Sequence, residues 1–211
     1  PGNMEITVTY TIADDDTLHI VYNGKADADT VMNCTNHSYF NLNGHESGSI
    51  EGQVLQIFAD AYTPVVDSSA IPTGEIADVT GTPFDFREAK AIGRDLGVEN
   101  EQLTNGAGYD HNWVLDRVAD TGLELAASVY EPASGRYMEV WTDQPALQFY
   151  GGNFFDGSTT GKYGRPLAYR ESIALETQKY PDTPNHPEFP STLLNPGEEY
   201  THVCVYRFSV K

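Results

Sequence analysis

Residues 4–12 read MEITVTYTI, and apolar and polar side chains alternate along the whole run. Successive side chains of a β-strand point to opposite faces of a sheet, so this alternation predicts a half-buried strand. Residues 14–16 are three aspartates, which favour a polar turn, and the alternation resumes with Leu18, Ile20 and Tyr22. The two runs predict a β-hairpin at the start of the chain.

Period-two alternation recurs in several later segments. Ser134 and Gly135 lie between two such runs and predict a turn over residues 132–136. Further strands are predicted at residues 113–115, 123–130, 137–142, 146–150, 173–178 and 201–210. We therefore expect a single all-β domain over residues 1–211, built as an antiparallel β-sandwich rather than as an α/β fold.

Helix signals are scarce in this sequence. Residues 85–96 form the best helix candidate, with Gly97 as a stop signal, although Gly93 interrupts them. The 19 glycines and 12 prolines are spread between the predicted strands, as many short connections require. We expect helix mainly in the region 85–96.

The charge of the chain restricts its partners. Its 31 acidic residues greatly outnumber its 12 basic ones, which gives a formal net charge of −19. Nucleic acid and anionic membrane surfaces require positive counter-charge, so neither is an expected partner, whereas a neutral sugar meets no such barrier. Cys34 and Cys204 form no disulfide framework and are expected to be free thiols in a reducing cytoplasm.

Two polar segments suggest a sugar site. Residues 36–42 read NHSYFNL and concentrate an imidazole, a hydroxyl, a phenol and two amides. Such a group suits hydrogen bonding to a sugar and proton transfer; the alternative for His37 is a structural bond to the backbone. In residues 108–113, GYDHNW, Asp110 could accept bonds from two sugar hydroxyls and Trp113 could stack on a sugar face. The alternative there is a turn followed by a strand.

Two further polar residues interrupt apolar strands. Gln148 lies between Leu147 and Phe149, and is either a buried amide that faces a cleft or the outward residue of a strand. Glu176 shares one strand face with Ala174 and Gln178, opposite the predicted core face. A carboxylate among such neighbours on a rigid strand suits a catalytic base, and a solvated strand glutamate is the alternative.

Metal and phosphate chemistry find no support in the spacing of ligands. The histidines at positions 37, 45, 111 and 186 are not paired at zinc-type spacing, and neither cysteine belongs to a CxxC pair. No glycine-rich phosphate-binding pattern occurs. We expect no metal and no cofactor.

Taken together, these segments resemble the galactose mutarotase (aldose 1-epimerase) family. The resemblance covers nearly the whole chain in order. It is carried by residues 33–42, 109–116, 147–153 and 175–191, and by the closing turn at 195–200. It implies a large antiparallel β-sandwich and an isomerase that interconverts the α and β anomers of free hexoses such as galactose and glucose.

The resemblance also implies roles for particular residues. His37 corresponds to the general acid and Glu176 to the general base. Asp110 and Gln148 correspond to residues that bind sugar hydroxyls. Ser38 and Tyr39 lie beside the acid.

The chain departs from the family in length. Family members begin well upstream, and the upstream part carries another histidine and an arginine or asparagine that hold the sugar. The resemblance therefore implies a fragment that lacks some strands, with reduced activity, an exposed apolar edge and a dimer through that edge.

Three other functions stay open from the residues alone. Asp110 and Glu176 could form the carboxylate pair of a glycoside hydrolase. A non-catalytic sugar-binding module is a second alternative. A hexose-6-phosphate epimerase is a third, although it would need basic residues that the four polar segments offer sparsely.

Overall fold

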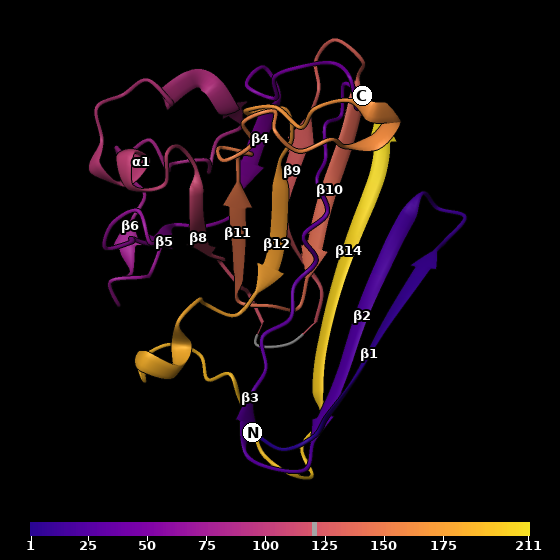
Figure 1. Cartoon of the computed structure of the whole chain (residues 1–211), viewed down its shortest axis with the longest axis vertical. Helices are drawn as coiled ribbons and strands as arrows, with labels where there is room; N and C mark the ends of the chain where they lie inside the picture. Colours follow the sequence, from indigo (N-terminus) through magenta and orange to yellow (C-terminus); the bar gives the residue numbers. More distant parts are fainter. Residues whose placement is uncertain (120–121) are drawn as a thin grey trace.

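The computed structural model describes residues 1–119 and 122–211, which form an all-β structure with antiparallel strand pairing. Figure 1 shows two sheets lying one in front of the other. The strands are β1 (Met4–Ile12), β2 (Thr17–Ala26), β3 (Thr30–Val31), β4 (Val54–Ile57), β5 (Ala61–Thr63), β6 (Ala77–Asp78), β7 (Lys90–Ala91), β8 (Asp110–Val114), β9 (Glu124–Tyr130), β10 (Arg136–Thr142), β11 (Ala146–Tyr150), β12 (Ala174–Gln178), β13 (Leu193–Leu194) and β14 (Tyr200–Val210).

The larger sheet has seven strands in the order β1-β2-β14-β10-β9-β4-β7. The predicted first hairpin is confirmed, because β1 and β2 pair along their whole length with Val8 opposite Tyr22. The predicted strands at 123–130, 137–142 and 201–210 correspond to β9, β10 and β14. Central strands of this sheet supply much of the buried core.

The smaller sheet has five strands in the order β12-β11-β8-β5-β6 and packs against the larger one. One of its faces supplies Trp113, Phe149 and Leu175 to the shared core. The two sheets are also joined by polar contacts. The hydroxyl of Tyr206 in β14 donates to the carbonyl oxygen of Leu175 in β12 at 2.9 Å. The opposite face of the smaller sheet is therefore free to carry polar side chains.

Strand β1 differs from the prediction in its burial. All nine of its residues are exposed, including Ile6 at 48% and Tyr10 at 60%, so the expected half-buried strand is wrong in this respect. Its apolar side chains lie on the same face as the buried Tyr22 and Ile20 of β2, because residues directly opposite in a sheet share a face. At this edge of the sheet no second layer covers that face within the part of the chain that is described.

Helix also lies elsewhere than predicted. The region 85–96 contains only the strand β7 and one 3₁₀ turn, η1 (Ile92–Asp95). Backbone pairing of Lys90 and Ala91 with β4 prevents a helix there. The α-helix of the described chain is α1 (Glu101–Asn105), which the side chain of Asn100 caps by accepting from the amides of Gln102 and Leu103. Two further 3₁₀ turns are η2 (Lys162–Gly164) and η3 (Thr183–Asn185).

Both cysteines are free thiols, as predicted, with Cys34 half-buried and Cys204 buried. None of the helices among the described residues is long and apolar enough to span a membrane.

Candidate functional site

The outward face of the smaller sheet carries a row of polar side chains. Asn112 of β8, Gln148 of β11 and Glu176 of β12 lie directly opposite one another and so project to the same face. Strand alternation places Trp113 and Phe149 on the other face, in the core. The sequence therefore builds a rigid polar surface on three neighbouring strands.

His37 reaches this surface from the segment between β3 and β4. That segment is fixed to the sheet by Phe40, which exchanges two backbone hydrogen bonds with Ile173 just before β12. Nε2 of His37 lies 3.3 Å from Oε1 of Glu176. The histidine side chain is 46% exposed and the glutamate side chain only 9%. The sequence-predicted acid and base are thus in direct contact.

Burial dominates the electrostatics of the two carboxyl groups. It raises the pKa of Glu176 to about 8, and the nearby charge of Asp110 acts in the same direction. Burial also raises the pKa of Asp110, while a hydrogen bond from Gln148 and the charge of His37 oppose this rise. The site therefore retains a proton that a carboxyl group in water would lose.

Gln148 orients Asp110. The side-chain amide of Gln148 donates from Nε2 to Oδ1 of Asp110 at 2.9 Å. This bond leaves the other carboxylate oxygen of Asp110 available to accept bonds from a ligand. All four of the predicted central residues, His37, Asp110, Gln148 and Glu176, consequently lie in one polar site.

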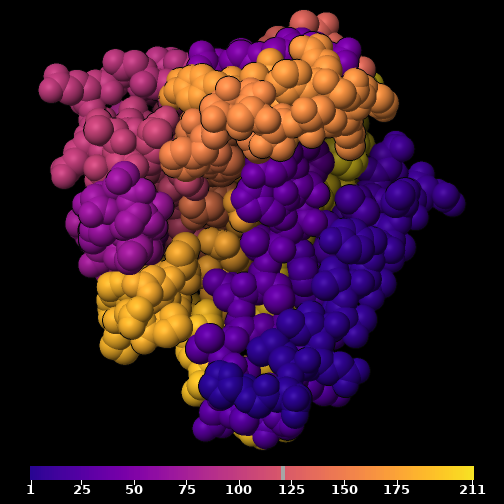
Figure 2. Space-filling model, in the orientation of Figure 1, coloured from indigo at the N-terminus to yellow at the C-terminus, as the bar shows by residue number. Residues whose placement is uncertain are grey.

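Aromatic rings line the approach to His37. The ring of Tyr39 lies 4.8 Å from the imidazole, and that of Tyr150 lies 6.1 Å from it. Phe155 contacts Tyr39 at a ring separation of 5.1 Å. His37, Ser38, Tyr39 and Phe155 are among the residues that line a cavity of about 610 Å³, whose lining does not include Asp110, Gln148 or Glu176. Figure 2 shows the loop between β11 and β12, in orange, lying across the front of the molecule above the segment that carries His37.

Comparison with known proteins identifies the family of the chain. The family model described as aldose 1-epimerase matches residues 1–207. The chain belongs to the aldose 1-epimerase family. It is 45% identical over 210 residues to a galactose mutarotase of Rattus norvegicus and 41% identical over 210 residues to an aldose 1-epimerase of Escherichia coli K12.

Solved structures of this family agree with the fold. The crystal structure of a GalM/aldose epimerase homologue from C. elegans is 31% identical and superposes with a TM-score of 0.88, covering 100% of this chain and 61% of that chain. A galactose 1-epimerase from Lactobacillus acidophilus superposes with a TM-score of 0.83 at 29% identity, covering 100% of this chain and 58% of that one. The match to the rat protein covers 100% of this chain and 59% of that protein, and the match to the Escherichia coli protein covers 99% and 59%. The chain therefore spans 59% of the length of these two relatives.

One sequence-based interpretation within this epimerase fold is wrong. Trp113 does not stack on a ligand, because it is fully buried and its indole Nε1 donates to the carbonyl oxygen of Phe84 at 3.0 Å. The alternation of β8 explains this, since Trp113 is an odd number of residues from Asp110 and must face the other way. The neighbouring His111 is also buried, which lowers its pKa to about 3 and keeps it neutral.

Tyr150 and Phe155 are site residues that the sequence reasoning missed. Tyr150 lies two positions after Gln148 on β11, so the same alternation would have placed it on the ligand face. Its hydroxyl accepts from the backbone amide of Phe154 at 2.9 Å, which fixes the start of the overlying loop. No comparable pattern points to Phe155, because it lies in a loop.

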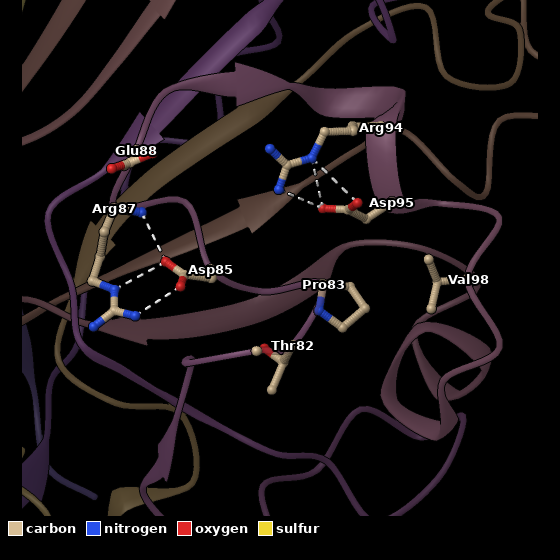
Figure 3. Close-up of a pocket in the computed structure, with 9 residues that line it drawn as sticks. Thr82, Pro83, Asp85, Arg87, Glu88, Arg94, Asp95 and Val98 are labelled. Carbon is tan, nitrogen blue, oxygen red and sulfur yellow. Dashed lines mark hydrogen bonds and ion pairs between the residues drawn. The ribbon is translucent and has the colours of Figure 1, made fainter.

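A second hollow of the epimerase fold, about 570 Å³ in volume, lies beside η1 (Figure 3). Apart from Glu88, the charged side chains that line it are paired with one another or with the neighbouring Lys90. Arg87 contacts Asp85 at 2.7 Å, Arg94 contacts Asp95 at 3.1 Å, and the buried Lys90 contacts Asp95 at 2.6 Å. These groups stabilise the connection around β7, and none of the six site residues predicted from the sequence lines this hollow.

Proposed function

We propose that the protein interconverts the α and β anomers of free aldohexoses such as galactose and glucose. The observation that carries this proposal is the 3.3 Å contact between Nε2 of His37 and Oε1 of Glu176, beside the Asp110–Gln148 pair. Membership of the aldose 1-epimerase family supports it. The reaction requires one ionised and one protonated group around a single pyranose, and these side chains can supply both.

During ring opening, Glu176 accepts a proton and His37 donates one. Glu176 removes the proton of the C1 hydroxyl, and protonated His37 gives its proton to the ring oxygen as the C1–O5 bond breaks. The C1 oxygen becomes the carbonyl of the open aldehyde. The pair then consists of a protonated carboxyl and a neutral imidazole. The two side chains together hold as many protons as before the step.

Ring closure reverses the proton flow. The open chain turns about its C1–C2 bond, and the hydroxyl oxygen at C5 attacks the other face of the aldehyde. His37 recovers the proton of that hydroxyl, while the carboxyl of Glu176 returns its proton to the C1 oxygen. Asp110 and Gln148 hold sugar hydroxyls during this rotation, and Ser38 and Tyr39 flank the acid. Every proton needed comes from the two side chains and the sugar.

Polarimetry on freshly dissolved α-galactose or α-glucose tests the proposal directly. The chain should accelerate the approach to the equilibrium rotation in proportion to its concentration. A full-length family member serves as the positive control, and should be faster if its additional residues help to hold the sugar. An unchanged rate at high chain concentration, with the full-length control active, would refute the activity for this chain.

Two alternatives give different results in the same experiments. A non-catalytic sugar-binding module would bind galactose in a calorimeter without accelerating its mutarotation. A glycoside hydrolase built on Asp110 and Glu176 would release monosaccharide from a disaccharide, which the proposed isomerase does not do.

We further propose a single-domain protein that works in the cytoplasm and associates through an exposed edge. The two free thiols suit a reducing compartment. The apolar face of β1 is exposed, and an uncovered apolar edge strand favours pairing with another strand, either upstream strands of the same fold or a second chain. A net charge of −19 argues against nucleic acid and anionic membranes as partners.

A further inference from the structure

Three amide side chains share the face of the smaller sheet that carries Glu176. Gln178 of β12 donates from Nε2 to Oδ1 of Asn112 in β8 at 3.4 Å. It reaches across β11 over Ala146, which lies opposite Gln178 and has a small side chain. Gln148 of β11 donates from Nε2 to Oδ1 of Asp110 at 2.9 Å. In both bonds the amide nitrogen is the donor.

No hydrogen bond joins these two pairs of residues, although each pair offers one unpartnered polar atom. Nδ2 of Asn112 and Oε1 of Gln148 are both buried, and neither has a hydrogen-bond partner among the described residues. The first atom is a donor and the second an acceptor, and their residues lie directly opposite each other on β8 and β11. A buried polar atom without a partner costs about 1–3 kcal/mol, so a bond between these two atoms removes both penalties.

We propose that Asn112 and Gln178 are positioning residues, which fix the amide of Gln148 so that its Nε2 faces Asp110 and keeps that carboxylate ionised. In the completed row, Gln178 donates to Asn112, Asn112 donates to Gln148, and Gln148 donates to Asp110. This inference rests on the proposed function, in which Asp110 binds sugar hydroxyls.

The physical reason lies in the symmetry of an amide group. Gln148 alone could present either its oxygen or its nitrogen to Asp110, and an oxygen there would repel the carboxylate. A donor from Asn112 at Oε1 selects the favourable orientation. An amide whose oxygen accepts a hydrogen bond is also a stronger donor at its nitrogen, so the row strengthens the last bond. Hydrogen bonding to the ionised form lowers the pKa of a carboxyl group.

Several titratable groups face Asp110 besides this row. His37 and Tyr39 approach from the segment after β3, Tyr150 lies on β11, and Glu176 lies on β12. The charge of Asp110 raises the pKa of Glu176. The amide row therefore acts on the base as well as on the sugar-binding carboxylate.

The test is a titration of the Asp110 carboxyl carbon by nuclear magnetic resonance in the whole chain. Asn112→Leu keeps the side-chain volume but removes the donor, and should raise the pKa of Asp110 by about 0.5 or more. Gln178→Met should raise it by a smaller amount. Thr63→Val is the discriminating variant, since Thr63 lies directly opposite Asn112 on β5 and its buried, unpartnered hydroxyl is the competing acceptor for Nδ2 of Asn112. If Nδ2 bonds to Gln148 as proposed, Thr63→Val leaves the pKa of Asp110 unchanged.

In the mutarotation assay, the same two row variants should raise KM several-fold and change kcat less. An unchanged pKa of Asp110 in folded Asn112→Leu would overturn the proposal, as would an equal rise in Thr63→Val. If Asn112→Leu does not fold, an unchanged pKa in Gln178→Met overturns it instead. The titration needs no sugar turnover, so a raised pKa in a chain without mutarotation would retain the amide row and reject the proposed activity.

Discussion

Nε2 of His37 and Oε1 of Glu176 lie 3.3 Å apart, although the histidine comes from the segment after β3 and the glutamate from β12. A protonated imidazole at this distance stabilises the ionised carboxylate, whereas burial and Asp110 favour its protonated form. The contact places a proton donor and a proton acceptor side by side, as an acid and a base that act together require.

Replacing Glu176 by Gln should lower the mutarotation rate by roughly a hundred- to ten-thousand-fold, because it removes the base while preserving the shape of the side chain. Polarimetry measures the effect. Glu139→Gln on β10 makes the same chemical change on the larger sheet and should leave the rate unaltered. Equal rates in the parent chain and Glu176→Gln would exclude Glu176 from the mechanism.

Replacing His37 by Asn should lower the rate within the same range, since it removes the acid. The double variant with Glu176→Gln should lose less than the product of the two single losses, because two groups that act as a unit are not additive. Rates of the four proteins, compared as a cycle, measure this coupling. Fully multiplicative losses would show that the two side chains act independently.

The buried carboxyl of Glu176 should make stability depend on pH. Its pKa is about 8 in the folded protein against an ordinary value of 4.5, so the unfolded chain releases this proton first as the pH rises. The stabilisation is complete below about pH 4.5 and is lost as the pH rises toward 8. Relative to the parent chain, Glu176→Gln should gain stability across this window, on the order of a few kcal/mol.

Urea unfolding of both proteins at a series of pH values provides that comparison. Buried histidines such as His111 titrate equally in the two proteins and cancel in the difference. A difference that stays constant from pH 5 to pH 8 would show that Glu176 is already ionised throughout this range in the folded protein.

The exposed apolar face of β1 should be tolerant of polar substitutions. Ile6→Thr together with Val8→Thr should change the free energy of unfolding by about 0.5 kcal/mol or less per site, because both side chains already contact water. The same pair should weaken self-association in sedimentation experiments. Ile20→Thr is the matched control on the same face, where burial is complete, and should cost roughly 2 kcal/mol or more.

A monomeric parent chain would contradict the association proposed for this edge. A large loss of stability in the β1 variants would instead show that another layer covers the strand in solution.

The strands were predictable from sequence because their alternation is local, and β10 and β14 follow it closely. The burial of β1 was not, since alternation defines an apolar face without specifying what covers it. The helix expected at residues 85–96 failed for a tertiary reason, because Lys90 pairs with β4 and its ammonium group bonds to Asp95. Asn100 was a usable capping signal for α1, but a helix of one turn lacks the periodicity that would draw attention to it.

The central residues of the site followed from ordered motifs, since His37, Asp110, Gln148 and Glu176 do lie together. The interpretation of Trp113 as a residue that stacks on the sugar was wrong. Strand alternation alone places it on the face opposite Asp110. Asn112 shows the limit of such reasoning. Its place on the ligand face follows from Asp110 by alternation, but its unpartnered Nδ2 depends on three strands meeting in space.

The unequal exposure of the two central side chains sets the route by which the site exchanges hydrogen isotopes with water. The side chain of His37 is 46% exposed to solvent, whereas that of Glu176 is only 9% exposed. Deuterium from heavy water therefore enters at the imidazole and reaches the carboxyl through the 3.3 Å contact or through the sugar. Small buffer acids reach the imidazole from the same exposed side, whereas the carboxyl of Glu176 is largely shielded from them.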